Sequence, residues 1–174
     1  MILETERLLL REYMPEDYDA VYAMVSDPET MRYYPKPYDA AGARRWIDWS
    51  LQNYREHGFG WWAVILKETG ECIGDCGLTM QPIDGENLPE IGYHLRKEFW
   101  RKGYGKEAAL AVRDWVFTHT DLGCVYSYMV QSNVGSWATA EAMGMQRLRE
   151  YTDAIYGEMY VYAITRDAWA KRNT

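Results

Sequence analysis

The spacing of apolar residues divides the first third of the chain into one strand and two helices. An apolar run over residues 7–13 predicts a first strand. Apolar residues then recur every three or four positions over residues 16–27, which predicts a helix between two prolines. A longer helix is predicted over residues 39–58, since Asp39 suits an N-cap and Gly58 suits a C-terminal stop.

The apolar period then changes to that of strands. Two runs rich in β-branched and aromatic residues surround Thr69-Gly70 within residues 61–81, which predicts a hairpin. Helical spacing returns directly after Gly105 and again over residues 135–144. Three further strands are predicted, at residues 88–99, 124–132 and 158–169. This order predicts an α/β (α+β) fold, in which a mixed central sheet is flanked by helices.

Length and composition fit one globular domain. The 174 residues contain no repeat or linker, so residues 1–174 are expected to form a single domain. Hydrophobic residues make up 48% of the chain, but no apolar run approaches the roughly 20 residues that span a membrane. Charged residues interrupt the apolar start at Glu4, Glu6 and Arg7, unlike in a signal peptide. We therefore expect a cytoplasmic protein without a membrane partner.

The formal net charge of −7 argues against a nucleic-acid partner, because contacts to phosphates need a basic face. It favours a cationic small molecule or peptide. The three cysteines show no paired ligand spacing, and no metal site is expected. Cys72 and Cys76 lie four residues apart on a predicted strand, hence on one face, and are expected to be reduced core residues.

The stretch "FWRKGYGKEAALAVRDWVF", residues 99–117, combines basic residues and two glycines with the start of a helix. The first amides of a helix have no intrahelical partner and attract anions, so this loop suits a phosphate or pyrophosphate. It lacks the early glycine and the hydroxyl after Lys106 that a Walker loop needs. It also lacks the third glycine of a dinucleotide fingerprint after Gly103 and Gly105.

Three motifs in the same order resemble those of the Gcn5-related N-acetyltransferases, the GNAT superfamily, and of its ribosomal-protein N-terminal acetyltransferase branch in particular. They are Glu90-Ile91-Gly92-Tyr93, the Phe99-Trp100 pair with the Gly-Tyr-Gly loop and Glu107-Ala108, and Asn133-x-x-Ser136. The opening strand and helix are also similar, so the resemblance covers nearly the whole chain. It implies a mostly antiparallel central sheet and an enzyme that moves the acetyl group of acetyl-CoA directly to a primary amine.

The resemblance also implies where acetyl-CoA binds. Backbone groups at three positions of one strand are expected to pair with the pantetheine arm: His94, Leu95 and Arg96. The loop amides, with basic side chains beside them, are expected to bind the pyrophosphate: Arg101, Lys102, Gly103, Tyr104, Gly105 and Lys106. Asn133 is expected to face the CoA arm as well.

Direct transfer needs a neutral amine, and a base is useful because deprotonation costs about 1.4 kcal/mol for each pKa unit above ambient pH. Glu90 is the expected base, acting directly or through a water, and Ser136 is the best local hydroxyl for the departing sulfur. Tyr33 and Tyr34 are expected to help wall the acceptor pocket, where either ring could stack on a cation.

Two departures from the family pattern leave alternatives open. Many members place a tyrosine where this chain has Ala140, so the usual proton donor to the thiolate is missing, and Met145 replaces an aromatic residue. A non-catalytic acyl-CoA-binding or sensing module is therefore one alternative, and a nucleotide-binding regulator is another. The acceptor could be a protein N-terminus, a polyamine, an aminoglycoside or a small amine metabolite. Either a monomer or a homodimer is compatible with the composition.

Overall fold

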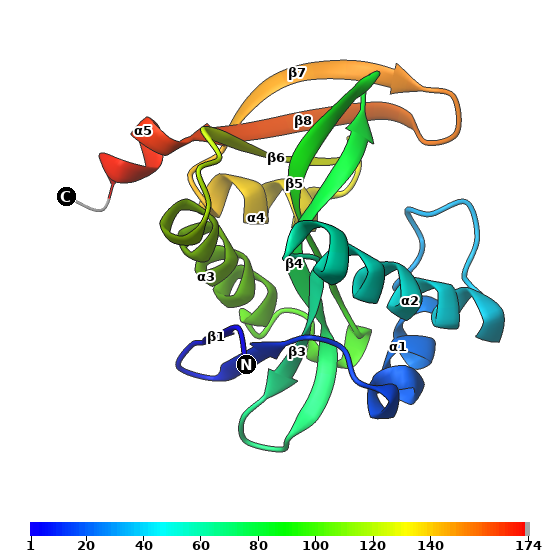
Figure 1. The fold of residues 1–174 in the computed structure, drawn as a ribbon. Helices are drawn as coiled ribbons and strands as arrows, with labels where there is room; N and C mark the ends of the chain where they lie inside the picture. The colour runs from blue at the N-terminus through cyan, green and yellow to red at the C-terminus, as the bar shows by residue number, and fades with distance from the viewer. Residues whose placement is uncertain (173–174) are drawn as a thin grey trace.

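The computed structural model describes residues 1–172 and contains one mixed sheet with helices on both faces (Figure 1). Its strands are β1 Leu3–Glu4, β2 Leu8–Arg11, β3 Trp61–Leu66, β4 Glu71–Ile83, β5 Glu86–Leu95, β6 Cys124–Val130, β7 Gln146–Asp153 and β8 Gly157–Thr165. Its helices are α1 Tyr18–Val25, α2 Ala40–His57, α3 Tyr104–His119, α4 Val134–Ala142 and α5 Arg166–Ala170. No helix among these residues combines the length and the apolar character that crossing a membrane requires.

The sheet confirms the mixed, mostly antiparallel architecture. Its spatial order is β1-β2-β3-β4-β5-β6-β8-β7, and every neighbouring pair is antiparallel except β5 with β6. Helices α3 and α4 cover one face, where Val112, Val116 and Met143 are fully buried. Helices α1 and α2 cover the other face through residues such as Met24 and Ala43. The sheet therefore separates two apolar cores.

The parallel pair β5–β6 separates almost at once. Glu90 opposite Tyr126 is the single cross-strand pair recorded for it within the described residues, whereas β4 and β5 pair continuously from Gly74–Leu95 to Ile83–Glu86. The end of β5 is consequently free of a neighbouring strand on one side. The gap that this leaves in the middle of the sheet positions the site described below.

The predicted ends of the long helix are confirmed. The carboxylate of Asp39 accepts a hydrogen bond from the amide of Gly42 at 2.7 Å and caps α2. Gly58 ends the helix with φ 76°, a left-handed conformation that glycine adopts without a Cβ clash. The hairpin around Gly70 is also present, as β3 and β4.

The strand expected over residues 88–99 ends at Leu95, and Lys97–Phe99 form a short 3-10 helix. Two further differences from the sequence expectation lie near the C-terminus. Strand β7 was not predicted, because it is an edge strand whose residues are mostly exposed, Leu148 included at 58%. Such a strand shows no apolar alternation. The last strand stops at Thr165 and not at residue 169, since the Thr165 hydroxyl accepts from the amide of Ala168 and starts α5.

The two cysteines of β4 do not share a face of the sheet, so that expectation is wrong. The register shifts between Val64 and Ile65 of β3, which leaves Ile73 as an extra residue on β4. A bulge of this kind reverses the alternation of side chains beyond it. Cys72 therefore packs in the α1–α2 core and Cys76 in the α3–α4 core; both are free thiols, as expected.

Candidate active site

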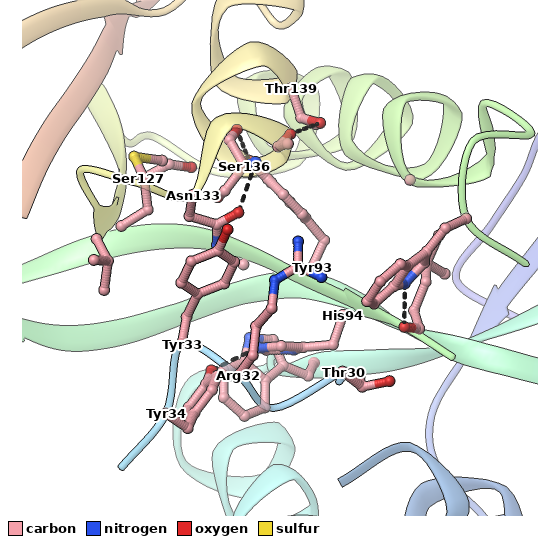
Figure 2. A pocket seen from close by; sticks show the side chains of 18 of the residues that line it. Thr30, Arg32, Tyr33, Tyr34, Tyr93, His94, Ser127, Asn133, Ser136 and Thr139 are labelled. Carbon is pink, nitrogen blue, oxygen red and sulfur yellow. Dashed lines mark hydrogen bonds between the residues drawn. The ribbon is translucent and has the colours of Figure 1, made fainter. Parts of the chain in front are cut away.

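A cavity of about 1640 Å³ opens where β5 and β6 diverge. Its walls come from β5, the first turns of α3 and α4, helix α2 and the loop between α1 and α2 (Figure 2). It is lined by twelve of the fourteen site residues predicted from the sequence: Tyr33, Tyr34, Glu90, His94, Leu95, Arg101, Gly103, Tyr104, Gly105, Lys106, Asn133 and Ser136. Arg96 and Lys102 are not among the lining residues.

Strand β5 supplies the chemistry of the cavity because its side chains alternate between the two faces of the sheet. Glu90, Gly92 and His94 share the face toward α2, and Tyr93 faces α4 instead. The residues opposite them on β4 are Thr79, Gly77 and Asp75 respectively. Two polar pairs thus flank a pair of glycines.

Glu90 is a buried carboxyl, only 6% exposed. The Thr79 hydroxyl donates to its Oε2 at 3.3 Å, and no basic side chain of the described residues forms an ion pair with it. Burial without a compensating cation disfavours the charged form and raises the pKa of Glu90 to about 8. The group can therefore exchange a proton near neutral pH.

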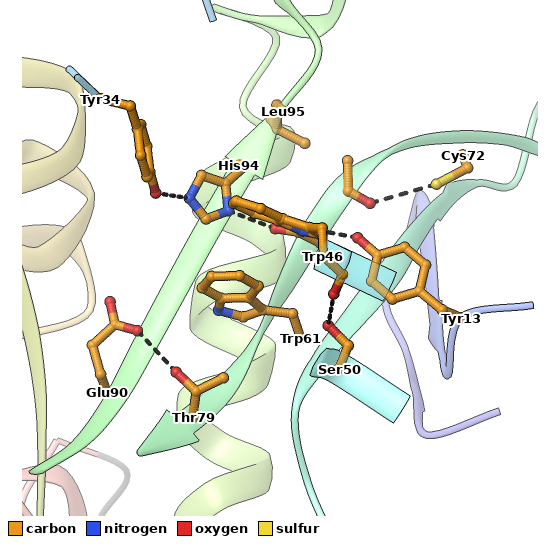
Figure 3. Close-up of polar contacts among 12 residues, drawn as sticks. Tyr13, Tyr34, Trp46, Ser50, Trp61, Cys72, Thr79, Glu90, His94 and Leu95 are labelled. Atoms are coloured by element: carbon orange, nitrogen blue, oxygen red, sulfur yellow. Dashed lines mark hydrogen bonds and ion pairs between the residues drawn. The ribbon is translucent and has the colours of Figure 1, made fainter. Parts of the chain in front are cut away.

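His94 belongs to a buried hydrogen-bond network that the sequence did not reveal (Figure 3). Its Nδ1 donates to Asp75 Oδ1 at 2.7 Å, while the other carboxylate oxygen accepts from Tyr13 Oη at 2.7 Å and Trp46 Nε1 at 2.8 Å. A neutral imidazole then has only a lone pair at Nε2, which accepts from Tyr34 Oη at 2.7 Å. The Tyr34 hydrogen is thereby committed, and its oxygen can accept hydrogen bonds in the cavity.

From the sequence, only the backbone of His94 was expected to contribute to the site, and Asp75 was not expected there. The two residues lie 19 positions apart and meet only because β4 and β5 pair. One signal could have identified the network: Asp75 is a carboxylate in the middle of an otherwise apolar strand, where an unpaired charge would be costly.

Trp61 lies over the glycine pair in the floor of the cavity. It is opposite Gly77 on β4, which is in turn opposite Gly92 on β5. A Cβ at Gly92 would lie 2.8 Å from Trp61 Nε1 and 2.8 Å from Glu90 Oε2, so the indole and the carboxyl approach the space that this glycine leaves open. The indole N–H is buried and has no hydrogen-bond partner among the described residues.

The glycine loop has the geometry of an anion site. Arg101 and Gly103 adopt left-handed backbone conformations, with φ 59° and 84°, and Gly103 begins α3 without a side-chain cap. The first amides of this helix therefore lack a side-chain acceptor and border the cavity at Tyr104, Gly105 and Lys106. They are available for a ligand with negative charge.

Contacts from the N-terminal hairpin hold this loop in place. Glu107, in the first turn of α3, accepts from Thr5 Oγ1 at 2.5 Å and from Arg7 Nε at 2.7 Å. Arg7 also donates to the carbonyl of Lys102 at 2.9 Å. The Lys102 ammonium lies over the ring of Phe99, which explains why this side chain does not line the cavity.

Arg96 also points away from the cavity. Its guanidinium pairs with Glu71 at 2.6 Å and Glu98 at 2.8 Å, and its amide donates to the carbonyl of Ile73 on β4 at 2.9 Å. The alternation of backbone groups along β5 turns His94 toward β4 as well, so two of the three expected pantetheine contacts, His94 and Arg96, face β4 and not the gap.

The neighbouring residues present their backbone to the gap. On that side the Ile91 carbonyl accepts from Ser127 Oγ at 2.7 Å, and the alternation of an antiparallel strand places the groups of Tyr93 and Leu95 there too. The Leu95 carbonyl accepts from Trp100 Nε1 at 2.7 Å. Tyr93 was not predicted as a site residue, although it belongs to the motif that the sequence analysis singled out.

The start of α4 forms the opposite wall. Asn133 caps this helix by accepting from the amide of Ser136 at 3.3 Å, and both residues line the cavity. The Ser136 hydroxyl lies 3.4 Å from Tyr93 Oη, which donates to the Ser136 carbonyl at 2.7 Å. Ala140 is fully buried in the core and contributes no polar group to the cavity, whereas Thr139 reaches its wall.

The loop between α1 and α2 closes the cavity on the side that faces the start of α4 and strand β5. Tyr33 donates to the carbonyl of Ser132 at 3.2 Å, and Lys97 pairs with Asp27 at 2.7 Å. This ammonium lowers the pKa of Asp27 to about 2. Figure 2 shows Tyr33 and Tyr34 reaching from this loop toward α4 and β5 respectively. A buried acid, an uncapped helix and a closing loop thus surround one space.

Comparison with known proteins identifies the family of the chain. A model of the acetyltransferase (GNAT) domain matches residues 7–146. The chain belongs to the GNAT acetyltransferase family. This confirms the resemblance stated from the three motifs, and with it an enzyme of the transferase class.

Relatives of this GNAT protein cover almost its whole length. The protein described as uncharacterized N-acetyltransferase p20 of Bacillus licheniformis is 35% identical over 180 residues, covering 97% of this chain and 98% of its own. A solved acetyltransferase from Agrobacterium tumefaciens is 33% identical with a TM-score of 0.79, covering 93% and 92% of the two chains. The ribosomal L7/L12 alpha-N-protein acetyltransferase RimL, solved with coenzyme A, has a TM-score of 0.79 over 96% and 98%, but its 17% identity shows likeness of fold alone.

Proposed function

We propose that the protein transfers the acetyl group of acetyl-CoA directly to a primary amine. One observation carries the proposal: the uncapped start of α3 and the buried carboxyl of Glu90 border the same cavity in a GNAT acetyltransferase. The first feature suits the pyrophosphate of acetyl-CoA, and the second suits an amine that must lose a proton. That RimL was solved with coenzyme A supports this choice of donor.

In this proposal acetyl-CoA lies along the gap between β5 and β6. The loop amides up to Lys106 bind its pyrophosphate, with Arg101 and Lys106 adding positive charge. The backbone of Tyr93 and Leu95 pairs with the pantetheine amides as a missing strand would. Binding far from the thioester then positions the reacting carbon.

The chemical step needs one base and one proton source. The amine nitrogen attacks the thioester carbon, the carbon–sulfur bond breaks, and the amine proton passes to Glu90, directly or through a water. The thiolate takes a proton from water, either directly or through the Ser136 hydroxyl, which passes one proton on and regains one from the water, and this yields the N-acetylated product and free CoA. A carboxyl with a pKa of about 8 is well matched to this role, because a general base works best near its own pKa.

The test is the release of CoA thiol from acetyl-CoA over a panel of primary amines, with the wild type and Glu90→Gln. We expect the wild-type rate to rise as the pH passes through about 8, and the variant to lose about a hundredfold in kcat with little change in CoA affinity. Glu86→Gln, an exposed position on the same strand, is the control and should behave as the wild type. An identical pH–rate profile in Glu90→Gln would remove Glu90 from the base role, and CoA binding without thiol release for any amine would favour the sensing module.

A further inference from the structure

The acceptor end of the cavity has a distinctive composition, which bears on the amine that the proposed transfer uses. Six aromatic residues form a continuous set of ring contacts there, with centroids 4.6 to 6.4 Å apart. We call them the aromatic box: Tyr34, Tyr38, Trp46, Trp49, Trp61 and Tyr156. All six line the cavity. Flat apolar walls of this extent favour a flat apolar ligand.

The polar groups of the box are few, and they converge on one place. The Glu90 carboxyl and the Trp61 N–H approach the open space above Gly92. Among the described residues the Trp61 N–H has no hydrogen-bond partner, and Glu90 has no basic partner and only the 3.3 Å contact from the Thr79 hydroxyl. Tyr34 also lines the cavity, and when His94 is neutral the Tyr34 oxygen can accept a hydrogen bond there, because its own hydrogen is donated to His94 Nε2. One amino group, with N–H donors for Glu90 and Tyr34, suits this set of groups.

The charges around the cavity do not suit a polycation. Its described lining residues include five basic side chains and three carboxyls, although the whole chain carries −7. Two of these carboxyls are near cations already: Glu29 lies 3.7 Å from Lys97, and Glu98 lies 2.8 Å from Arg96. Glu90 is therefore the one lining carboxyl of the described residues without a basic partner. Each further ammonium of a ligand would lack a counter-charge, and burying it would be unfavourable.

From this arrangement we infer that the acceptor is a small monoamine whose single primary amino group is attached to an aromatic or similarly flat apolar body. The inference rests on the proposed acetyl transfer and narrows its acceptor. The negative charge of the sequence favoured cationic acceptors in general. The cavity wall favours the narrower class of ligands that carry one amino group next to an aromatic ring. Polyamines and aminoglycosides, with several ammonium groups and polar bodies, fit it poorly.

The experiment compares acceptors with the intact protein and acetyl-CoA, following thiol release and identifying the N-acetylated product by mass spectrometry. The acceptors are 2-phenylethylamine, n-butylamine, spermidine, kanamycin and a serine-initiated peptide. We expect kcat/KM for 2-phenylethylamine to exceed the kcat/KM of each other acceptor by about tenfold or more. Its ring fills the apolar pocket, whereas n-butylamine leaves the pocket partly empty and the other acceptors bring polar or charged groups into it. A higher kcat/KM for any of the other four would overturn the acceptor class while leaving the transfer itself intact.

A variant of the box separates recognition from folding. Trp49→Leu should raise KM for 2-phenylethylamine about tenfold and raise KM for n-butylamine much less. Tyr22→Leu removes an exposed aromatic residue outside the cavity and is the matched control, expected to change neither. Quenching of tryptophan fluorescence by 2-phenylethylamine in the presence of CoA gives a binding readout that needs no turnover. Equal KM values for Trp49→Leu and wild type would overturn the role of the box, and absence of product with every amine would overturn the proposed transfer and the acceptor class with it.

Discussion

Glu90 lines the cavity and Asp75 lies behind the lining residue His94; both are buried carboxyls, yet their surroundings differ. Asp75 accepts from three donors, Tyr13, Trp46 and His94, while Glu90 has only a 3.3 Å contact from Thr79. A carboxylate surrounded by donors is fixed, and one without a cation remains free to gain or lose a proton. The first organises the pocket and the second can work on a substrate.

The raised pKa of Glu90 makes folding stability depend on pH. Its folded pKa of about 8 exceeds the ordinary 4.5, so the native state holds the proton more tightly than the unfolded chain. This stabilisation is complete below about pH 4.5 and is lost as the pH rises through 8, at about 1.4 kcal/mol for each unit of pKa. Between pH 5 and 9 the wild type should lose more unfolding free energy than Glu90→Gln in urea titrations. The exposed Glu68→Gln should follow the wild type; parallel losses in all three proteins would contradict the prediction.

Removing the charge of Asp75 should destabilise the whole network. Asp75→Asn replaces an acceptor oxygen by an amide that also donates, which leaves at least one of three buried donors unpaired. We expect a loss of about 2–3 kcal/mol in the free energy of unfolding, against about 1 kcal/mol for Tyr13→Phe, which removes a single donor. Chemical unfolding followed by tryptophan fluorescence measures both. A cost for Asp75→Asn no larger than that for Tyr13→Phe would show that the donors find other partners.

At the scale of single elements, the start of α3 combines two requirements at one residue. Gly103 has φ 84°, and a Cβ there would lie 3.2 Å from the Arg7 guanidinium, which anchors the loop to the N-terminal hairpin. A side chain at this position would disturb both the left-handed turn and the anchor. The conformation of the loop therefore depends on Arg7, which comes from the N-terminal hairpin and lies far from the loop in the sequence.

Gly103→Ala should therefore weaken CoA binding several-fold, measured by calorimetry. The matched control is Gly70→Ala in the β3–β4 turn, where φ is 73° and the space around the Cβ is open. Both substitutions carry a similar backbone cost of about 1 kcal/mol, but only the first should change CoA affinity. Equal affinities in the two variants would separate the loop from the pyrophosphate.

The elements that the sequence predicted are those with strong apolar periods or glycine stops. Helix α2, with Asp39 and Gly58 at its ends, is the clearest case. The missed strand β7 lies at an edge of the sheet and buries few side chains, so its sequence shows no hydrophobic spacing that would predict a strand. The bulge at Ile73 depends on how β3 and β4 pair, and one strand's sequence does not contain that information.

At the scale of the whole molecule, sequence motifs identified the residues at the gap between β5 and β6 but not the residues that meet across strands. Glu90 and Ser136 were found because each lies in a motif that resembles a family. Trp61 and Tyr156 come from other elements, and only the paired strands and the packed loop bring them to the cavity. Asp75 meets His94 only because β4 and β5 pair. The residues proposed to bind acetyl-CoA were thus easier to predict from the sequence than those proposed to bind the amine.

The gap itself should respond to the donor. If acetyl-CoA pairs with β5 as proposed, the amides of Tyr93 and Leu95 should exchange hydrogen more slowly when CoA is bound, since they gain acceptors there. Amides in the continuous β4–β5 pairing, such as that of Thr79 opposite Glu90, give the reference. Hydrogen exchange followed by NMR measures both sets. Unchanged exchange at Tyr93 and Leu95 under saturating CoA would place the pantetheine elsewhere.

The early divergence of β5 and β6 also has a mechanical meaning. Within residues 1–172, one cross-strand pair joins the sheet across this line, and β6, β7 and β8 lie beyond it. A force that pulls the two ends of the chain apart would meet few hydrogen bonds there, so this line should be the first to open. An acetyl-CoA molecule bound in the gap would contact both parts of the sheet and hold them together. The protein should therefore withstand greater pulling forces with acetyl-CoA bound than without it.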